Sequence, residues 1–144
     1  MNKLLKPVRT QAQAYERVLD HLNAGMLGAT GHKMWYSFFG SKRKVKTCVY
    51  SQGDKACGVG CLLSHDQQQD LIKRKYNAAT INTLIEVIGK DNIVHATGLN
   101  VKQLTALQSK HDSWANSQAQ ERISKDEFRA YVNQRLKAAQ RLGR

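Results

Sequence analysis

The chain contains very little proline and few aromatic residues. Its single proline, Pro7, lies near the N-terminus of the 144 residues, so proline breaks no helix further along. Aromatic residues make up only 7% of the chain, whereas hydrophobic residues make up 41%. We therefore expect one domain over residues 1–144 with an aliphatic core, in which glycines and helix caps mark the ends of the elements.

Acidic residues are scarce as well. The 11 Asp and Glu residues against 23 Lys and Arg residues give a formal net charge of +12. Such an excess attracts nucleic-acid phosphates, anionic membranes or acidic protein surfaces. No apolar run approaches the ~20 residues of a membrane span, and the N-terminal MNKLLKPVRTQAQAY lacks the apolar core of a signal peptide. We therefore predict a cytoplasmic protein that does not contact membranes.

The three cysteines are an odd number, which favours a reducing compartment over a disulfide scaffold. All three lie in CVYSQGDKACGVGCLLSHD, whose C-x8-C-x3-C-x3-H spacing is similar to that of CCCH zinc fingers. The last Cys–Cys gap is shorter than in those fingers, and an extended strand would hold its two sulfurs ~13 Å apart. We therefore predict buried thiols and no cofactor, with zinc as an alternative whose ligands would be Cys48, Cys57, Cys61 and His65.

A second chemical hypothesis is a nucleophilic dyad of Cys57 with His111. Asp112 follows His111 directly, and neighbours in a helix point about 100° apart, so we expect that Asp112 does not orient the imidazole. Gln108 and His111 are three residues apart and share a helix face. They either form a polar site with a cysteine or, the interpretation that we favour, hydrogen-bond to backbone groups of a hairpin.

Hydrophobic spacing and caps predict a mainly helical α+β domain packed around one short β-hairpin. The hairpin is expected over residues 46–63, with strands at 46–50 and 56–63 joined by the turn SQGDK. Gly58 and Gly60 are poor strand residues, which indicates that another backbone or an aromatic ring approaches closely there. The stretch 24–45 has no clear period. Helices are expected over residues 8–23, 65–75, 80–88, 101–114 and 124–142.

The run CVYSQGDKACGVGCLLSHDQ, followed by LTALQSKHDSW, resembles a family of small proteins of tailed bacteriophages and prophages. That family pairs a C-A-V-G-C-L-type strand with a later L-Q-x-x-H-D helix. This chain departs from the family pattern at Gly58, at Ser64–His65 and by its MWYSFFGSKRKVK insert. The resemblance implies phage origin and the host-cell cytoplasm, and it implies no mechanism.

The basic residues fall into three clusters: SKRKVK, the K-R-K run at 73–75, and the C-terminal helix. Such clusters can follow a phosphate backbone, and four nearby aromatic residues could stack on bases. The candidate stacking residues are Trp35, Tyr36, Phe38 and Phe39. The candidate phosphate or partner contacts are Lys42, Arg43, Lys44, Lys46, Lys73, Arg74, Lys75, Arg129, Lys137 and Arg141.

Three function classes follow from these observations. The first is a small basic phage accessory protein that binds nucleic acid non-specifically, or binds a machine associated with nucleic acid. The alternative is an inhibitor or adaptor that docks on an acidic surface of a host protein. A Cys–His enzyme is third, because the sequence has no glycine-rich phosphate loop, paired carboxylates or H-E-x-x-H motif.

Overall fold

The computed structural model describes residues 8, 10–36, 42–77, 80–116, 119 and 121–144, with residues 32–36 and 42–47 described by their backbone alone. It confirms a mainly helical α+β fold with small antiparallel sheets. Within these ranges, every helix is too short or too polar to cross a membrane. The core is mainly aliphatic, as the composition predicted: fully buried leucines such as Leu71, Leu84, Leu104 and Leu107 surround the buried rings of Tyr15, Tyr50 and Phe128.

Five helices form close to where the sequence predicts them. In four of them a capping box fixes the start, because the N-cap side chain and the third helical residue exchange hydrogen bonds with each other's backbone. The N-caps of these four are Thr10, Ser64, Asn100 and Ser124. The five helices are α1 (Gln11–Asn23), α2 (His65–Lys73), α3 (Ile81–Ile88), α5 (Val101–Ala115) and α6 (Lys125–Arg141).

A sixth helix, α4 (Lys90–Thr97), was not expected from the sequence. Gly89 ends α3 and begins α4, and it does so with φ of 98°, a backbone angle that residues with a side chain rarely adopt. No side chain caps α4 at its start. Gly98, with φ of 72°, ends it. Because α4 follows α3 without a loop, the sequence shows no turn that would separate them.

The predicted hairpin over residues 46–63 is wrong in its strand pairing. Only its turn is present, where β3 (Ser51–Gln52) pairs with β4 (Lys55–Ala56). The first predicted strand instead belongs mostly to β2 (Lys42–Cys48), which pairs along its whole length with β1 (Thr30–Tyr36) in an antiparallel ribbon. The pairing was missed because β1 lies in the stretch without a clear hydrophobic period.

The second predicted strand, 56–63, is a compact turn that ends in the short 3-10 helix η2 (Gly60–Leu62). Thiols stabilise this turn: Cys57 Sγ accepts a hydrogen bond from Gly60 N, and Cys61 Sγ donates one to Gly58 O. The expected close approach of another backbone is present. A Cβ atom on Gly60 would lie 1.9 Å from the carbonyl oxygen of Tyr50. Glycine is therefore required here by packing against backbone.

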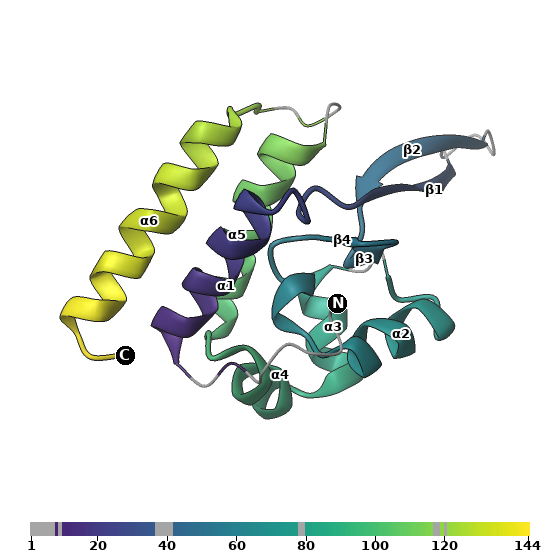
Figure 1. The fold of residues 1–144 in the computed structure, drawn as a ribbon. Coiled ribbons are helices and arrows are strands. Elements are labelled where there is room, and N and C mark those ends of the chain that lie inside the picture. The colour runs from purple at the N-terminus through teal and green to yellow at the C-terminus, as the bar shows by residue number, and fades with distance from the viewer. Residues whose placement is uncertain (1–7, 9, 37–41, 78–79, 117–118, 120) are drawn as a thin grey trace.

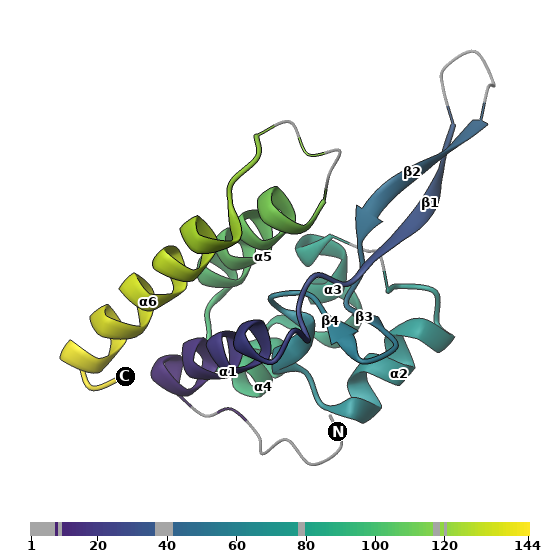
Figure 2. The same ribbon diagram turned by 45° about the horizontal axis from the view of Figure 1, so that its top comes forward.

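The ribbon of β1 and β2, which we call the arm, projects away from the helical body (Figures 1 and 2). α1 packs along α6, and α5 also contacts α6. In both views the arm and α2 lie on one side of the molecule and α6 lies on the other. The fold thus separates the basic clusters of the sequence into two surfaces.

Candidate functional site

The polar residues of α5 hold two loops against the helix. Gly28 N donates a hydrogen bond to His111 Nε2 at 3.1 Å, and Val59 N donates one to Gln108 Oε1 at 3.3 Å. His111 is completely buried. Its ring makes edge-on contacts with Trp114. This confirms the interpretation that both side chains satisfy backbone groups, although His111 pairs with the loop before β1 and not with the hairpin.

The direction of these hydrogen bonds fixes the proton on the imidazole. A backbone N–H always donates, so Nε2 of His111 accepts from Gly28 and the neutral ring carries its hydrogen on Nδ1. That nitrogen lies 3.4 Å from Oδ1 of Asp112. The same oxygen accepts a hydrogen bond from Nε2 of Gln108 at 2.9 Å. The N–H on Nδ1 of His111 and the Nε2 amide of Gln108 thus both face the same acceptor, Oδ1 of Asp112.

The expectation that Asp112 does not face His111 is wrong. Although successive residues of a helix point in different directions, the short Asp112 side chain reaches sideways to the preceding ring. Gln108, one turn earlier, holds the carboxylate in that position. The helix-wheel argument failed because it treats directions alone and leaves out a third side chain that bridges neighbours.

Cys48, at the end of β2, lies beside this network. Among the described residues, the one group of three potential metal ligands consists of Cys48, His111 and Asp112, whose ligand atoms lie within 4.8 Å of one another. A metal on Nδ1 of His111 would move the ring proton to Nε2, where it would face the N–H of Gly28. The network therefore favours a structural role for His111 over metal binding. His65, a ligand in the zinc alternative, lies outside this group and is exposed on α2.

The buried thiols are not set up as nucleophiles. Cys57 Sγ accepts from Gly60 N at 3.1 Å, and burial raises the pKa of Cys57 to about 12. Burial also raises the pKa of Cys61, which is fully enclosed. Because the thiolate is the reactive form of cysteine, these raised pKa values make both thiols unreactive near neutral pH. Nε2 of His111, the ring nitrogen that would accept the proton from a thiol, already accepts a hydrogen bond from Gly28 N. The geometry therefore gives the Cys57–His111 dyad no support.

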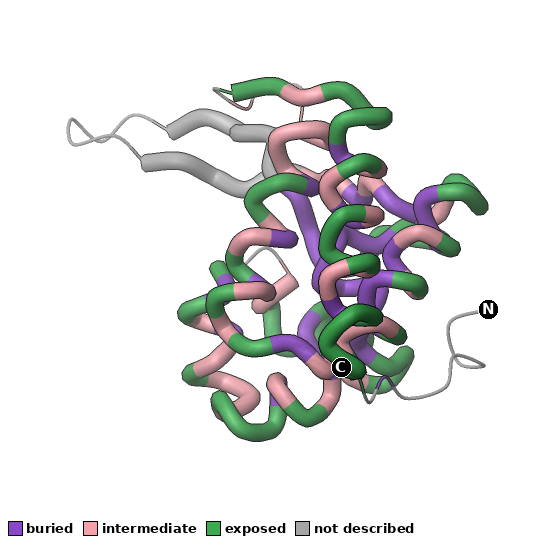
Figure 3. Tube along the Cα trace, turned by 90° about the vertical axis from the view of Figure 1, so that its left-hand side faces the viewer, coloured by how far each residue is buried: buried purple, intermediate pink, exposed green. Residues whose placement is uncertain are grey.

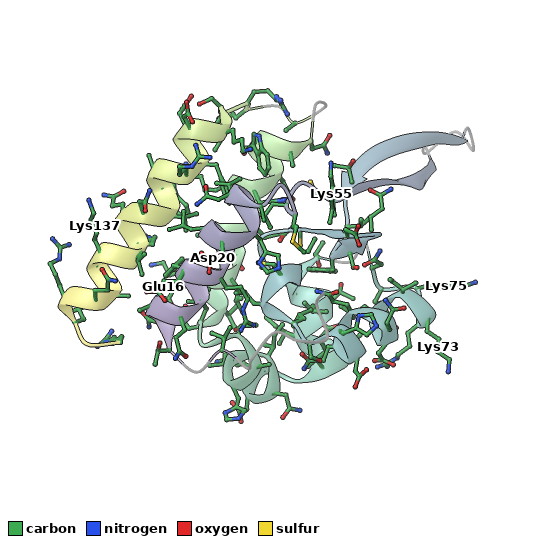
Figure 4. The ribbon with its side chains drawn as sticks, in the orientation of Figure 1. Glu16, Asp20, Lys55, Lys73, Lys75 and Lys137 are labelled. Atoms are coloured by element: carbon green, nitrogen blue, oxygen red, sulfur yellow. The ribbon has the colours of Figure 1, made fainter. Side chains whose placement is uncertain are left out.

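The basic residues of α6 share their surroundings with acids. Arg129 is half-buried and pairs with Asp126 at 2.8 Å, whereas Lys137 and Arg141 are exposed. Figure 3 looks onto α6 and shows its exposed outer turns. The neighbouring helix α1 exposes Glu16 and Asp20, which Figure 4 shows on the same side of the molecule as Lys137. The surface around α6 is therefore of mixed sign.

The arm differs from α6 because it lies in a stretch without acids. The sequence has no Asp or Glu between Asp20 and Asp54. Two of the four predicted stacking residues, Trp35 and Tyr36, lie on β1. The register of the ribbon pairs Trp35 with Arg43 and Tyr36 with Lys42. The other two, Phe38 and Phe39, lie outside the described residues. The five basic residues of the arm are Lys33, Lys42, Arg43, Lys44 and Lys46.

Further basic residues lie on the same side of the molecule as the arm. Lys73 and Lys75 are exposed where α2 ends, and in Figure 4 they point away from the body on the side opposite Lys137. Arg74 is partly engaged, since it lies 3.4 Å from Asp70. Lys55, which sequence reasoning did not single out, is exposed on β4. The signal that could have identified the arm is the long run without an acid, residues 21–53, which Lys55, Lys73 and Lys75 lie outside.

Three comparisons, with models of protein families, with curated proteins and with solved structures, found no significant match to this chain.

Proposed function

We propose that the protein binds nucleic acid through contacts between the arm and the phosphate backbone. The observation that carries this proposal is the projection of an antiparallel ribbon with five basic residues and no acidic residue from the helical body (Figure 2). In the setting that the phage resemblance implies, the protein acts as an accessory protein in the host-cell cytoplasm, on nucleic acid or on a machine associated with it.

Physical chemistry supports the arm as the surface that binds. Phosphate contacts gain free energy mainly by releasing condensed counterions, and this gain requires cations that are not already paired with acids. The sequence of the arm contains no acidic residue, whereas Arg129 of α6 is already paired with Asp126. Lys55, Lys73 and Lys75 are further exposed lysines on the same side of the molecule, where Asp54, Asp66 and Asp70 are exposed as well. The arm itself, whose sequence contains no acid, therefore satisfies the requirement better than α6 does.

The proposal is tested by the salt dependence of binding. We expect nuclease-treated protein to bind a fluorescent DNA duplex, with an affinity that falls steeply between about 50 and 200 mM salt. A triple variant, Lys42→Gln, Lys44→Gln and Lys46→Gln, removes three potential phosphate contacts. The slope of log K against log salt should then shrink by roughly 2 to 3, since each contact contributes about 0.9.

A matched control removes three charges from the opposite surface: Lys125→Gln, Lys137→Gln and Arg141→Gln, all at exposed positions of α6. We expect this control to change the slope by less than about 1. If the α6 variant loses the salt dependence and the arm variant retains it, the binding surface is α6. If the protein binds no nucleic acid even at about 50 mM salt, the proposal fails, and an acidic surface of a host protein becomes the partner to seek by affinity purification.

A further inference from the structure

We propose that the partner of the arm is the major groove of double-stranded DNA, which the ribbon of β1 and β2 enters. This inference rests on the proposed function and specifies the nucleic acid and the mode of binding.

The shape of the arm favours a duplex over a single strand. β1 and β2 pair at every position from Thr30 opposite Cys48 to Tyr36 opposite Lys42. Seven residues in a strand span roughly 23 Å, and the ribbon stands away from the body in two views (Figures 1 and 2). Single strands are bound by proteins that offer them a groove with stacking side chains. A projecting ribbon does the opposite, because it enters a groove that the nucleic acid supplies.

The width of the ribbon distinguishes between the grooves. Its two strands lie about 4.8 Å apart, and side chains add to that width. The major groove of B-form DNA is about 12 Å wide and admits a two-stranded ribbon, whereas the minor groove is only about 6 Å wide. In an RNA duplex the major groove is deep and narrow, and side chains cannot read it. B-form DNA is therefore the duplex that fits the arm.

Positive charges follow β2 along its length. Lys42, Lys44 and Lys46 occupy every second position of the strand. Alternate residues of an antiparallel strand are roughly 6.8 Å apart, so these charges spread over about 14 Å of the ribbon and can meet several phosphates along a groove wall. At the base of the arm, exposed Lys55 on β4 can reach phosphates at the groove edge.

The test measures binding of the full chain to three probes of one sequence: duplex DNA, duplex RNA and single-stranded DNA. We expect duplex DNA to bind at least about tenfold more tightly than the other two, because the major-groove contacts exist only there. Methyl green, which occupies the major groove, should displace the protein, and netropsin, which occupies the minor groove, should not. In the arm variant with Lys42→Gln, Lys44→Gln and Lys46→Gln, the preference for duplex DNA should fall below about twofold. The α6 control variant should keep it.

The outcomes separate this inference from the proposed function. Salt-dependent binding that needs the arm but is equal for all three probes would overturn the major groove and leave phosphate binding in place. Displacement by netropsin and not by methyl green would place the arm in the minor groove and overturn the inference. Absence of binding to every probe would overturn the proposed function itself.

Discussion

Replacement of His111 by phenylalanine tests the role of this residue most sharply. The substitution keeps an aromatic ring beside Trp114 and Phe128, whose centroids lie 5.5 and 6.0 Å from that of His111. It removes the acceptor for Gly28 N, which is 3.1 Å away. A fully buried donor left without a partner costs about 1–3 kcal/mol. Because Gly28 is only partly buried, we expect the free energy of unfolding to fall by an amount at the lower end of that range, about 1 kcal/mol.

Two further substitutions separate the hydrogen bond from the packing. In His111→Gln an amide oxygen can take the place of Nε2, so this variant should lose mainly the ring contacts, which are worth about 0.5–1.5 kcal/mol each. His111→Ala loses both contributions and leaves a cavity, so its cost should reach about 3–5 kcal/mol. Urea denaturation followed by circular dichroism measures all three values.

The same variants test whether His111 has any function besides stability. We expect folded His111→Phe protein to bind duplex DNA with the affinity and salt slope of the original chain. A free energy of unfolding unchanged in His111→Phe would refute the hydrogen bond from Gly28. Normal stability combined with lost binding would assign His111 to the functional site and contradict the structural role derived from its fixed tautomer.

Three other perturbations follow from the core. Gly60→Ala would place a Cβ atom 1.9 Å from the oxygen of Tyr50, so it should lower the free energy of unfolding in urea by at least about 3 kcal/mol. Gly53→Ala, which has open space around it, should cost only about 1–2 kcal/mol because of its left-handed backbone. Equal costs for the two variants would contradict the close approach at Gly60. Cys57→Ser should lower the free energy of unfolding by about 1–3 kcal/mol, because it buries a hydroxyl. Metal analysis of the original protein should find well below one zinc per chain. Stoichiometric zinc that disappears in the variant would contradict the buried-thiol interpretation. Burial lowers the pKa of His21, so the unfolded state binds more protons than the folded state as pH falls through about 6.5. The free energy of unfolding should therefore decrease from pH 7 to pH 5 by more in the original protein than in His21→Phe. Equal pH dependence in the two proteins would show that His21 is not the group responsible.

The helices could be predicted because their signals are local. Ser64 with Gln67 and Ser124 with Glu127 place a cap and its reciprocal partner within four residues, and the helices begin there. α4 lacks such a signal, since Gly89 caps it without a side chain. The sequence therefore predicts a helix where side chains form its N-terminal cap, and it does not predict one where only a backbone angle marks the start.

The arm and the polar network depend on contacts between residues that are far apart in the sequence, and such contacts cannot be predicted from a single sequence. Thr30 pairs with Cys48 across the ribbon, and the two strands show no shared alternation of polar and apolar residues. The spacing of Gln108 and His111 correctly placed them on one face of α5. Their most informative partner, Gly28, lies 83 residues away and contributes only a backbone N–H, so no residue type marks it.

The charge pattern of the sequence indicates the proposed binding surface, whereas the cysteine motif does not. The cysteines, which drew attention as ligands or nucleophiles, are buried and free of disulfides. The lack of acidic residues between Asp20 and Asp54 coincides with the projecting arm. The sequence already separates the two clusters, because α6 contains Asp126 and Glu127 whereas the arm contains no acid, and the fold adds that the arm projects from the body.

The central claim, that the arm is the surface that binds nucleic acid, is tested most directly by amide chemical-shift mapping. The chain of 16.2 kDa is suitable for a titration with a short DNA duplex. We predict that the largest shifts or line broadening occur at 30–36 and 42–48, with smaller effects at Lys55, Lys73 and Lys75 and none along α6. Shifts concentrated on α6 between Arg129 and Arg141, with the amides of β1 and β2 unchanged, would contradict the account.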